Sequence, residues 1–288
     1  MTAEQLARIL VSLTASFQLS ADCEFTVEVN PETYAREKFL AYRSLGVNRV
    51  SLGVQSFQPR YLRRLGRVST REKIVEALRG LQSIFANVSL DLMNNLPEQT
   101  LAESAADLRT AVNYAPQHIS CYELTWEAGT PLLAENLAVN ELGEAMYKQT
   151  QEILAENGYV QYEISNYARP GFASRHNLAY WSEQSYLGLG LAAHSYNQDR
   201  GWRWSNTKNL ADYLGKLFRR EPEPEDGFNK IMLGLRKNVG IPDAYLDERQ
   251  KAKARQMIAE ELLIRQDNNF CLTNRGRLVL NQVLLELM

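Results

Sequence analysis

Four polar side chains stand at or just past the ends of successive β-branched runs of the sequence: Glu28, Gln55, Arg67 and Asp91. In parallel α/β folds the carboxyl ends of neighbouring strands meet at one edge of the sheet, and ligands bind there. A carboxylate can accept hydrogen bonds from an ammonium group or from ribose hydroxyls, and an arginine can bind a carboxylate through two hydrogen bonds. The set therefore suits a polar zwitterionic ligand. The alternative is that these strand ends are polar simply because they are exposed.

The elements that must position these side chains begin with a β-α-β unit at residues 24–57. Two β-branched runs, residues 25–29 and 49–54, are separated by a helical segment that starts near Thr33 and ends at Gly46. Parallel pairing requires a crossover of about a dozen residues, which this segment supplies. Gly46 suits the position after a helix end, because a glycine adopts the left-handed conformation there without steric cost.

Two more strand–helix alternations follow this unit. Ser69 and Glu72 form a capping box for the next helix, and a strand at residues 87–93 carries Asp91. A helix from about Leu101 leads to a fourth strand at residues 118–124. Regular alternation of this kind predicts an α/β fold with a parallel barrel or an open sheet.

The pattern loosens after Gly129. A helix is expected at residues 141–157, followed by an irregular stretch at residues 159–181 that is rich in tyrosine. Long irregular segments in compact domains are usually functional or disordered, and this one has too many aromatic residues to be disordered.

The acidic, proline-punctuated segment 221–227 is the expected linker between two domains, residues 1–220 and 227–288. Helices near residues 228–237, 247–263 and 275–287, with a turn at 267–269, predict a small winged-helix-like α+β domain. Such a domain could bind DNA, but this one is not strongly basic, so we expect no nucleic-acid partner.

Composition narrows the class of protein further. The formal net charge is −2, and no run of about 18 apolar residues exists that could span a membrane. The N-terminus lacks the features of a signal peptide, so we expect a cytoplasmic location. Cys23, Cys121 and Cys271 are widely separated, which predicts buried thiols and argues against a disulfide framework or a local metal site.

Two histidines are candidates for ligand binding. His176 lies close to Tyr180 and Trp181, and flanking aromatics suit a flat macrocycle such as heme, which needs an axial donor and apolar surroundings. The alternative is a hydrogen-bonded structural histidine. His194 competes for the same role, whereas His118, inside a strand, is expected to be structural. The sequence holds no GxSxG, HExxH or Walker-type motif.

Several motifs together carry a family resemblance. They include EVNP (28–31), GVNRVSLGVQSF (46–57), LGR (65–67), SLDLMNNLPEQT (89–100), GYVQYEISNYARPG (158–171), RHNLAYW (175–181), YLGLGLAAHSY (186–196) and LTNRGRLVLN (272–281). In these motifs the chain resembles the oxygen-independent coproporphyrinogen III oxidase-like radical SAM family, and RHNLAYW and QYEISN favour its heme chaperone branch. The resemblance implies a partial (β/α) barrel of six strands with a small C-terminal domain.

The resemblance also implies ligand contacts. Glu28 would face the methionyl amino group of S-adenosylmethionine, Arg67 the methionyl carboxylate, and Gln55 and Asp91 the ribose hydroxyls. Thr125 would line the adenine side. Heme would be bound at His176, or less favourably at His194, and delivered to respiratory proteins, some of which could be membrane-associated.

The sequence departs from the family pattern in two respects. It lacks the CxxxCxxC loop that holds a [4Fe–4S] cluster and the GGGTPS loop after the second strand. We therefore expect a truncated chain that lacks the first barrel strands, has no catalytic or metal-ligating residues, and cannot cleave S-adenosylmethionine on its own. In addition, Asn94, Asn95 and Glu98 replace Tyr-Gly and Gly of the family's LIYGLPGQT motif, and loss of these glycines is expected to alter the turn.

The leading hypothesis from the sequence is thus a heme chaperone-like protein. One alternative is that the chain is the C-terminal part of a coproporphyrinogen oxidase-like oxidoreductase. The discovery of CxxxCxxC and GGGTP motifs in the translated upstream DNA would support this alternative. A second alternative is a non-catalytic α/β binding module, which failure to bind either S-adenosylmethionine or heme would favour.

Overall fold

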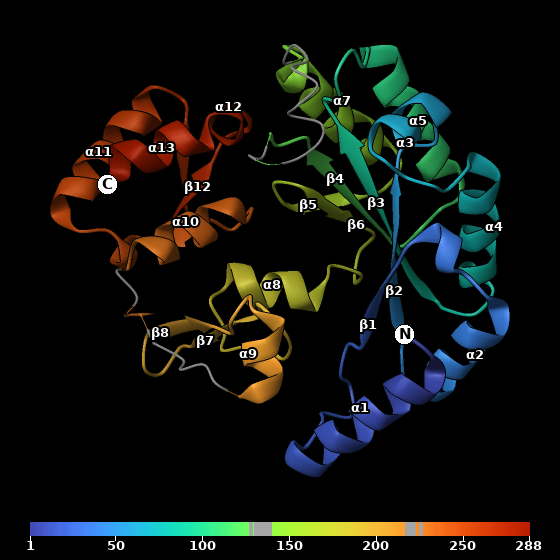
Figure 1. The fold of residues 1–288 in the computed structure, drawn as a ribbon. Coiled ribbons are helices and arrows are strands. Elements are labelled where there is room, and N and C mark those ends of the chain that lie inside the picture. The colour runs from blue at the N-terminus through green and yellow to red at the C-terminus, as the bar shows by residue number, and fades with distance from the viewer. Residues whose placement is uncertain (127–128, 130–139, 217–222, 225–226) are drawn as a thin grey trace. The chain divides into compact units, whose positions relative to one another are not determined.

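The computed structural model describes residues 1–126, 129, 140–216, 223–224 and 227–288, and it separates into two compact units, Met1–Ala173 and Ser174–Met288 (Figure 1). The segment predicted to be a linker, 221–227, lies largely outside the described residues, so the domain boundary at that segment stays a prediction. Among the described residues, no helix has both the length and the apolar run that crossing a bilayer would need.

The first unit is built on one six-stranded sheet with the order β1-β2-β3-β4-β6-β5. The first four strands pair in parallel, and the last two join antiparallel. The strands are β1 (Thr26–Val29), β2 (Arg49–Gln55), β3 (Asn87–Asn94), β4 (His118–Glu123), β5 (Val160–Glu163) and β6 (Asn166–Ala168). The predicted α/β class with a mostly parallel sheet is confirmed.

Helices connect the parallel strands and cover one side of the sheet, as α2, α4 and α5 show in Figure 1. The helical segments of this unit are α1 (Ala3–Ser16), η1 (Pro31–Thr33), α2 (Arg36–Ser44), α3 (Pro59–Arg64), α4 (Arg71–Gln82), α5 (Leu101–Asn113) and α7 (Gly143–Glu156). The helix after β1 is interrupted early, because Pro31 starts a short 3₁₀ turn before α2. Gly46 has φ +97°, the left-handed conformation predicted at this helix end.

Side chains alternate between the two faces of the sheet, as the pleat requires. The face under the helices is apolar, and its buried residues pack against the helices in one core, including Val50, Leu52, Leu90 and Ile119. The opposite face carries mainly polar residues at register-paired positions. These are Thr26 and Glu28, Arg49 and Ser51, Ser89 and Asp91, His118 and Ser120, and Asn166.

Two local predictions were wrong. Helix α4 is capped by Thr70, whose hydroxyl accepts from the Lys73 amide, because Ser69 instead donates a hydrogen bond to Glu32. The stretch at 159–181 is not irregular, since it forms β5, β6 and a helix. Aromatic residues favour strands when one face is buried, and Tyr167 in β6 is 2% exposed.

The second unit contains two three-stranded sheets, β7-β8-β9 and β10-β12-β11. Its strands are β7 (His194–Asn197), β8 (Trp202–Ser205), β9 (Glu223–Pro224), β10 (Ile241–Pro242), β11 (Leu263–Gln266) and β12 (Asn269–Leu272). Its helical segments are α8 (Arg175–Trp181), α9 (Leu210–Gly215), α10 (Phe228–Arg236), η2 (Asp243–Tyr245), α11 (Glu248–Ala259), α12 (Asn274–Leu278) and α13 (Leu280–Leu287). The predicted final helix is therefore two helices that meet at Val279.

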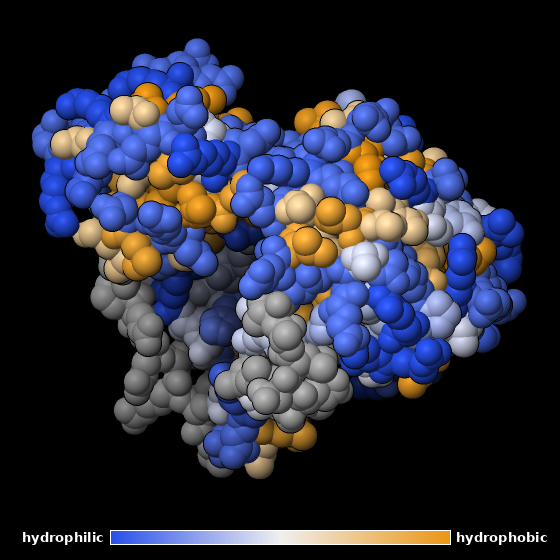
Figure 2. Space-filling model, turned by 90° about the horizontal axis from the view of Figure 1, so that it is seen from above, coloured by the Kyte–Doolittle hydropathy of each residue, from blue (hydrophilic) through white to orange (hydrophobic). Residues whose placement is uncertain are grey.

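The C-terminal part of this unit has its own core around Leu235, Ile241, Phe270 and Val283. Helices combined with a small antiparallel sheet match the predicted α+β composition. On the surface seen in Figure 2, hydrophilic side chains dominate and apolar ones form smaller areas among them, which is ordinary for a folded protein.

Candidate functional site

Asp91 is held on the polar face of the sheet by serines from both neighbouring strands. Ser51 on β2 donates to its two carboxylate oxygens, at 3.0 and 3.1 Å, and Ser120 on β4 also hydrogen-bonds to it. Burial raises the pKa of Asp91, and the negative charge of Glu28 adds to the rise, while these serine hydrogen bonds and the charge of Arg49 oppose it. The two serines thus fix the carboxylate in position, and the negative charge of Glu28 repels it.

Gln55, Asn30 and Arg67 converge where β1 and β2 end. The Arg67 Nη1 donates to Asn30 Oδ1 at 2.9 Å. A Cβ atom built on Gly53 would lie 3.1 Å from Gln55 Nε2 and 3.5 Å from Asn30 Oδ1, so both side chains lie over this glycine. The guanidinium, the amide and the strand tips that the sequence singled out are therefore brought together.

Glu28 and Thr125 lie at the exposed margins of this edge. Glu28 is an exposed side chain on β1, at the register position beside Ser51. Thr125 is exposed two residues past β4, where the Leu124 amide donates to the Asn94 carbonyl at 3.1 Å and continues the pairing of β3 and β4. Thr125 thus shares the edge with the other predicted contacts.

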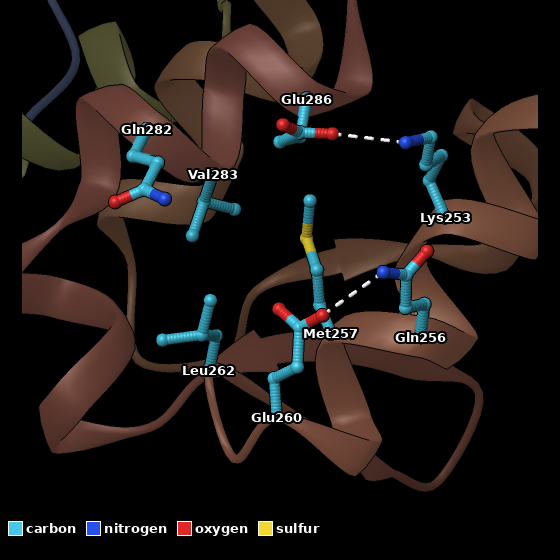
Figure 3. Close-up of a pocket in the computed structure, with 8 residues that line it drawn as sticks. All are labelled: Lys253, Gln256, Met257, Glu260, Leu262, Gln282, Val283 and Glu286. Atoms are coloured by element: carbon cyan, nitrogen blue, oxygen red, sulfur yellow. Dashed lines mark hydrogen bonds and ion pairs between the residues drawn. The ribbon is translucent and has the colours of Figure 1, made fainter.

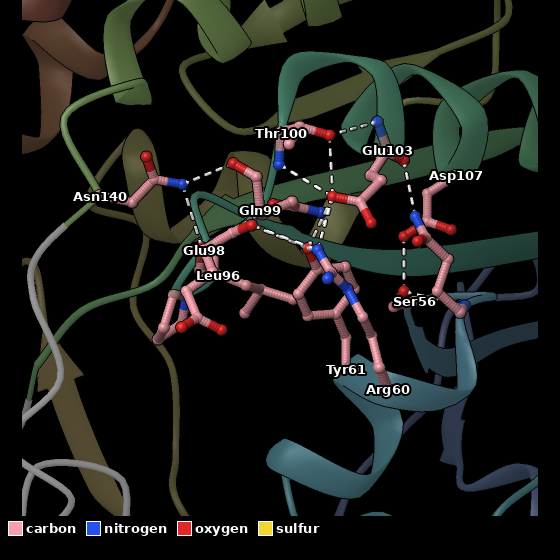
Figure 4. A network of polar contacts seen from close by, with 12 residues as sticks. Ser56, Arg60, Tyr61, Leu96, Glu98, Gln99, Thr100, Glu103, Asp107 and Asn140 are labelled. Atoms are coloured by element: carbon pink, nitrogen blue, oxygen red, sulfur yellow. Dashed lines mark hydrogen bonds and ion pairs between the residues drawn. The ribbon is translucent and has the colours of Figure 1, made fainter.

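The turn after β3 keeps a glycine-like backbone although two family glycines are replaced. Asn95 has φ +55° and Glu98 has φ +61°, both left-handed. Helix α3 holds this turn from outside, because Arg64 Nη1 donates to the Pro97 carbonyl and to Glu98 Oε2, each at 2.9 Å. In addition, Arg60 Nη2 donates to the Glu98 carbonyl at 3.2 Å (Figure 4). Both positions therefore have the backbone conformation that glycine favours, and whether the turn differs from that of the family stays a prediction.

His176 and His194 belong to the second unit, and both are exposed. His176 lies in the first turn of α8, and its ring contacts Tyr180 edge-on at a centroid distance of 4.7 Å. Tyr180 in turn contacts Tyr186 at 4.4 Å, so the imidazole belongs to a row of aromatic rings. An exposed imidazole beside aromatic side chains is chemically able to serve as an axial donor to a heme.

His118 is fully buried on the polar face of the first unit, as its place in a strand predicts. Its Nδ1 lies 2.7 Å from Ser89 Oγ and its Nε2 lies 2.9 Å from the Tyr162 hydroxyl. Burial lowers the pKa of His118 to about 3, and the nearby Arg49 adds to this, so the ring is neutral. A neutral imidazole donates through one nitrogen and accepts through the other, which fits its two partners.

A separate groove of about 290 Å³ lies in the C-terminal part of the second unit, between α11 and α13 (Figure 3). Its rim is polar: Lys253 pairs with Glu286 at 2.9 Å, and Gln256 donates to Glu260 at 3.0 Å. None of the site residues predicted from the sequence lines it.

The cysteines do not fit an iron–sulfur cluster, whose ligands are clustered thiolates. Cys121 lies in β4, where burial raises its pKa to about 12 and keeps it a thiol, while Cys23 precedes β1 and Cys271 is in the second unit. Among the described residues, no three His, Cys, Asp or Glu side chains are grouped so that they could hold a metal ion.

Comparison with known proteins identifies the family. Residues 2–111 match the model of the radical SAM superfamily. The heme chaperone HemW of Haemophilus influenzae is 33% identical over 98% of this chain and 78% of its own length. The chain belongs to the HemW family. HemW of Synechocystis sp. is 36% identical over 86% of this chain, and HemW of Escherichia coli is 40% identical over 65% of it.

The match to these relatives is partial. The chain spans 65% of the Synechocystis relative and 50% of the Escherichia coli relative. Among solved structures, the coproporphyrinogen III oxidase HemN of Escherichia coli covers the whole chain with a TM-score of 0.82 and 20% identity, and the chain covers 74% of that protein. This likeness concerns the fold.

Sequence reasoning missed Ser51 and Ser120, which fix Asp91. A signal was available, because in the strands that contain them polar residues alternate with Val, Leu or Ile, which is typical of a sheet with one polar and one apolar face. It also missed Asp107, which lies on a helix and holds the backbone that follows Gln55. No local pattern indicates that contact.

Proposed function

We propose that this chain forms part of a heme chaperone that binds S-adenosylmethionine at the strand tips of the first unit and heme at His176 in the second. The observation that carries the first half is the convergence of Gln55, Asn30 and Arg67 where β1 and β2 end. The match to the radical SAM superfamily supports S-adenosylmethionine as one ligand, and the similarity to proteins named heme chaperones supports heme as the other.

Each proposed contact follows from the charge of the side chain. Arg67 would bind the methionyl carboxylate, and Glu28 the methionyl ammonium group. Gln55 and Asp91 would hold the ribose hydroxyls, and Thr125 would lie on the adenine side. Asp91 suits this role because two serines orient its oxygens before a ligand arrives.

Cleavage of S-adenosylmethionine needs an electron, which a bound [4Fe–4S] cluster supplies in radical SAM proteins. Because Cys23, Cys121 and Cys271 do not fit such a cluster, we propose that these 288 residues bind the cofactor without cleaving it. Their contribution is to bind and orient the methionyl and ribose groups.

The heme half of the proposal rests on the exposed imidazole of His176 beside Tyr180. One ring nitrogen of His176 would coordinate the iron, and the aromatic side chains would contact the macrocycle. His194 is the alternative donor. Respiratory proteins that need heme would be the recipients.

Titration with hemin tests this half. We expect a shift of the Soret band on binding, and we expect His176→Ala to weaken the apparent affinity about tenfold, which corresponds to about 1.4 kcal/mol. His194→Ala is the matched control, because His194 is also an exposed histidine of the same unit, and it should bind hemin like the unaltered chain. No shift at micromolar hemin would rule out the heme site, and a larger loss in His194→Ala would move the axial ligand to His194.

A further inference from the structure

Gln55 has a backbone conformation that its residue type disfavours. Its φ is +64°, in the left-handed region, and it follows an irregularity in the register between β2 and β3. Residues without a glycine's freedom persist in that region when the surrounding structure holds them there, and such positions are often found at ligand sites.

The backbone after Gln55 is held by Asp107, a residue on α5 (Figure 4). The Ser56 hydroxyl donates to Asp107 Oδ2 at 2.5 Å, and the Phe57 amide donates to Asp107 Oδ1 at 3.0 Å. Ser56 Oγ also accepts from the Gln58 amide at 3.0 Å. One carboxylate thus organises three consecutive residues directly behind Gln55.

This arrangement is deeply buried. Ser56 is 0% exposed and Asp107 is 3% exposed, and no ion pair joins Asp107 to a cation within the described part of the chain. A buried carboxylate is costly, and its hydrogen bonds to a single turn make up for part of that cost. An apolar residue could pack there without this penalty, but it could not hold the turn.

The consequence of the turn is the position of the Gln55 amide. In the left-handed conformation its Nε2 lies over Gly53 and beside Asn30, the residue that binds Arg67. If the turn relaxed to an ordinary extended conformation, the side chain would leave this edge, because a change of φ redirects the Cα–Cβ bond.

We propose that Asp107 is a positioning residue that holds the Gln55 turn from the helix side of the sheet and thereby sets the affinity for the ribose of the ligand. This inference rests on the proposed binding of S-adenosylmethionine at the strand tips. Asp107 acts through Gln55 and does not touch the ligand.

The test uses Asp107→Asn in the full chain. Asparagine has the same shape, but its one acceptor oxygen cannot serve both Ser56 and Phe57, and the bond that remains is weaker because the group carries no charge. Ser56→Ala removes the same hydrogen bond from the other side. The matched control is Ser104→Ala, another buried polar position on α5.

Binding of S-adenosylhomocysteine is measured by isothermal titration calorimetry in these variants and in a Gln55→Ala background. We expect Asp107→Asn and Ser56→Ala to weaken binding about tenfold while Ser104→Ala binds normally. In the Gln55→Ala background, Asp107→Asn should have no further effect, because coupled residues are not additive. An equal loss in both backgrounds would overturn the proposal, since it would show that Asp107 acts independently of Gln55.

Amide hydrogen exchange at Phe57 and Gln58 tests the role of Asp107 without a ligand, so a failure of this inference can be distinguished from a failure of the proposed function. Exchange at these amides should accelerate at least tenfold in Asp107→Asn with the melting temperature kept near that of Ser104→Ala. Unchanged exchange would overturn the role of Asp107 whether or not the ligand binds. Failure of the unaltered chain to bind S-adenosylhomocysteine would instead refute the binding site itself and, with it, the effect on affinity.

Discussion

At the scale of a single residue, Asp91 is well oriented for ligand binding, but its burial is energetically costly. Its carboxylate is oriented by Ser51 and Ser120, which prepares it for hydroxyl donors, yet it is desolvated enough that burial raises its pKa. Burying a carboxyl group in such a place lowers the stability of the fold in favour of a ligand contact.

Asp91→Asn should therefore stabilise the chain and weaken S-adenosylhomocysteine binding. The pKa of Asp91 is raised on folding, so the unaltered protein loses stability as the pH rises from the unfolded value of 3.8 through the folded pKa. The asparagine variant has no such loss. Its advantage in the free energy of unfolding should be smallest in acid and should grow as the pH rises through the folded pKa of Asp91.

Urea unfolding at a series of pH values measures this difference. Asp199→Asn, at an exposed position of the second unit, is the control and should show no comparable trend. An advantage for Asp91→Asn that declined as the pH rose would contradict the assigned direction.

At the scale of an element, the turn between β3 and α5 also has a cost in stability. Glu98 has φ +61°, where a side chain costs about 1–2 kcal/mol, and its exposed ion pair with Arg64 contributes at most about 1 kcal/mol. The ion pair alone does not offset this cost, so the hydrogen bonds from Arg60 and Arg64 to the backbone of the turn are needed to stabilise it.

Glu98→Gly should be more stable than Glu98→Ala by about 1 kcal/mol, because both lose the ion pair and only glycine relieves the left-handed strain. Thermal or chemical unfolding measures the difference. Glu76 in α4 offers the matched control: it is exposed and paired with Lys73, but it is helical, so the order of the glycine and alanine variants should reverse there. If alanine were the better residue at both positions, the turn would not be strained.

At the scale of the whole molecule, the two proposed ligands fall on different compact units. The S-adenosylmethionine contacts lie within Met1–Ala173, and His176 and His194 lie within Ser174–Met288. A ligand stabilises the structure that binds it, so each should protect mainly its own unit.

Hydrogen exchange followed by mass spectrometry tests this expectation. S-adenosylhomocysteine should slow exchange at the ends of β1, β2 and β3, and hemin should slow it around α8. His176→Ala should remove the effect of hemin and leave the effect of S-adenosylhomocysteine unchanged. Protection of the strand tips by hemin alone would contradict the assignment of the two ligands to separate units.

The sequence by itself determined the features that depend on near neighbours. β-Branched runs that alternate with helical segments located the four parallel strands, Gly46 marked a helix end, and the polar strand ends pointed to Gln55, Arg67 and Asp91. Such patterns are readable because the periods of a strand and a helix are local properties.

The tertiary structure decided which distant residues meet. It added β5 and β6 antiparallel to the sheet, turned Ser51 and Ser120 toward Asp91, and joined Asp107 to Ser56 across 51 positions of the chain. It also kept Glu98 in a left-handed conformation that its residue type disfavours. These outcomes depend on strand order and on packing between elements, and the residues along a single segment carry no signal for either.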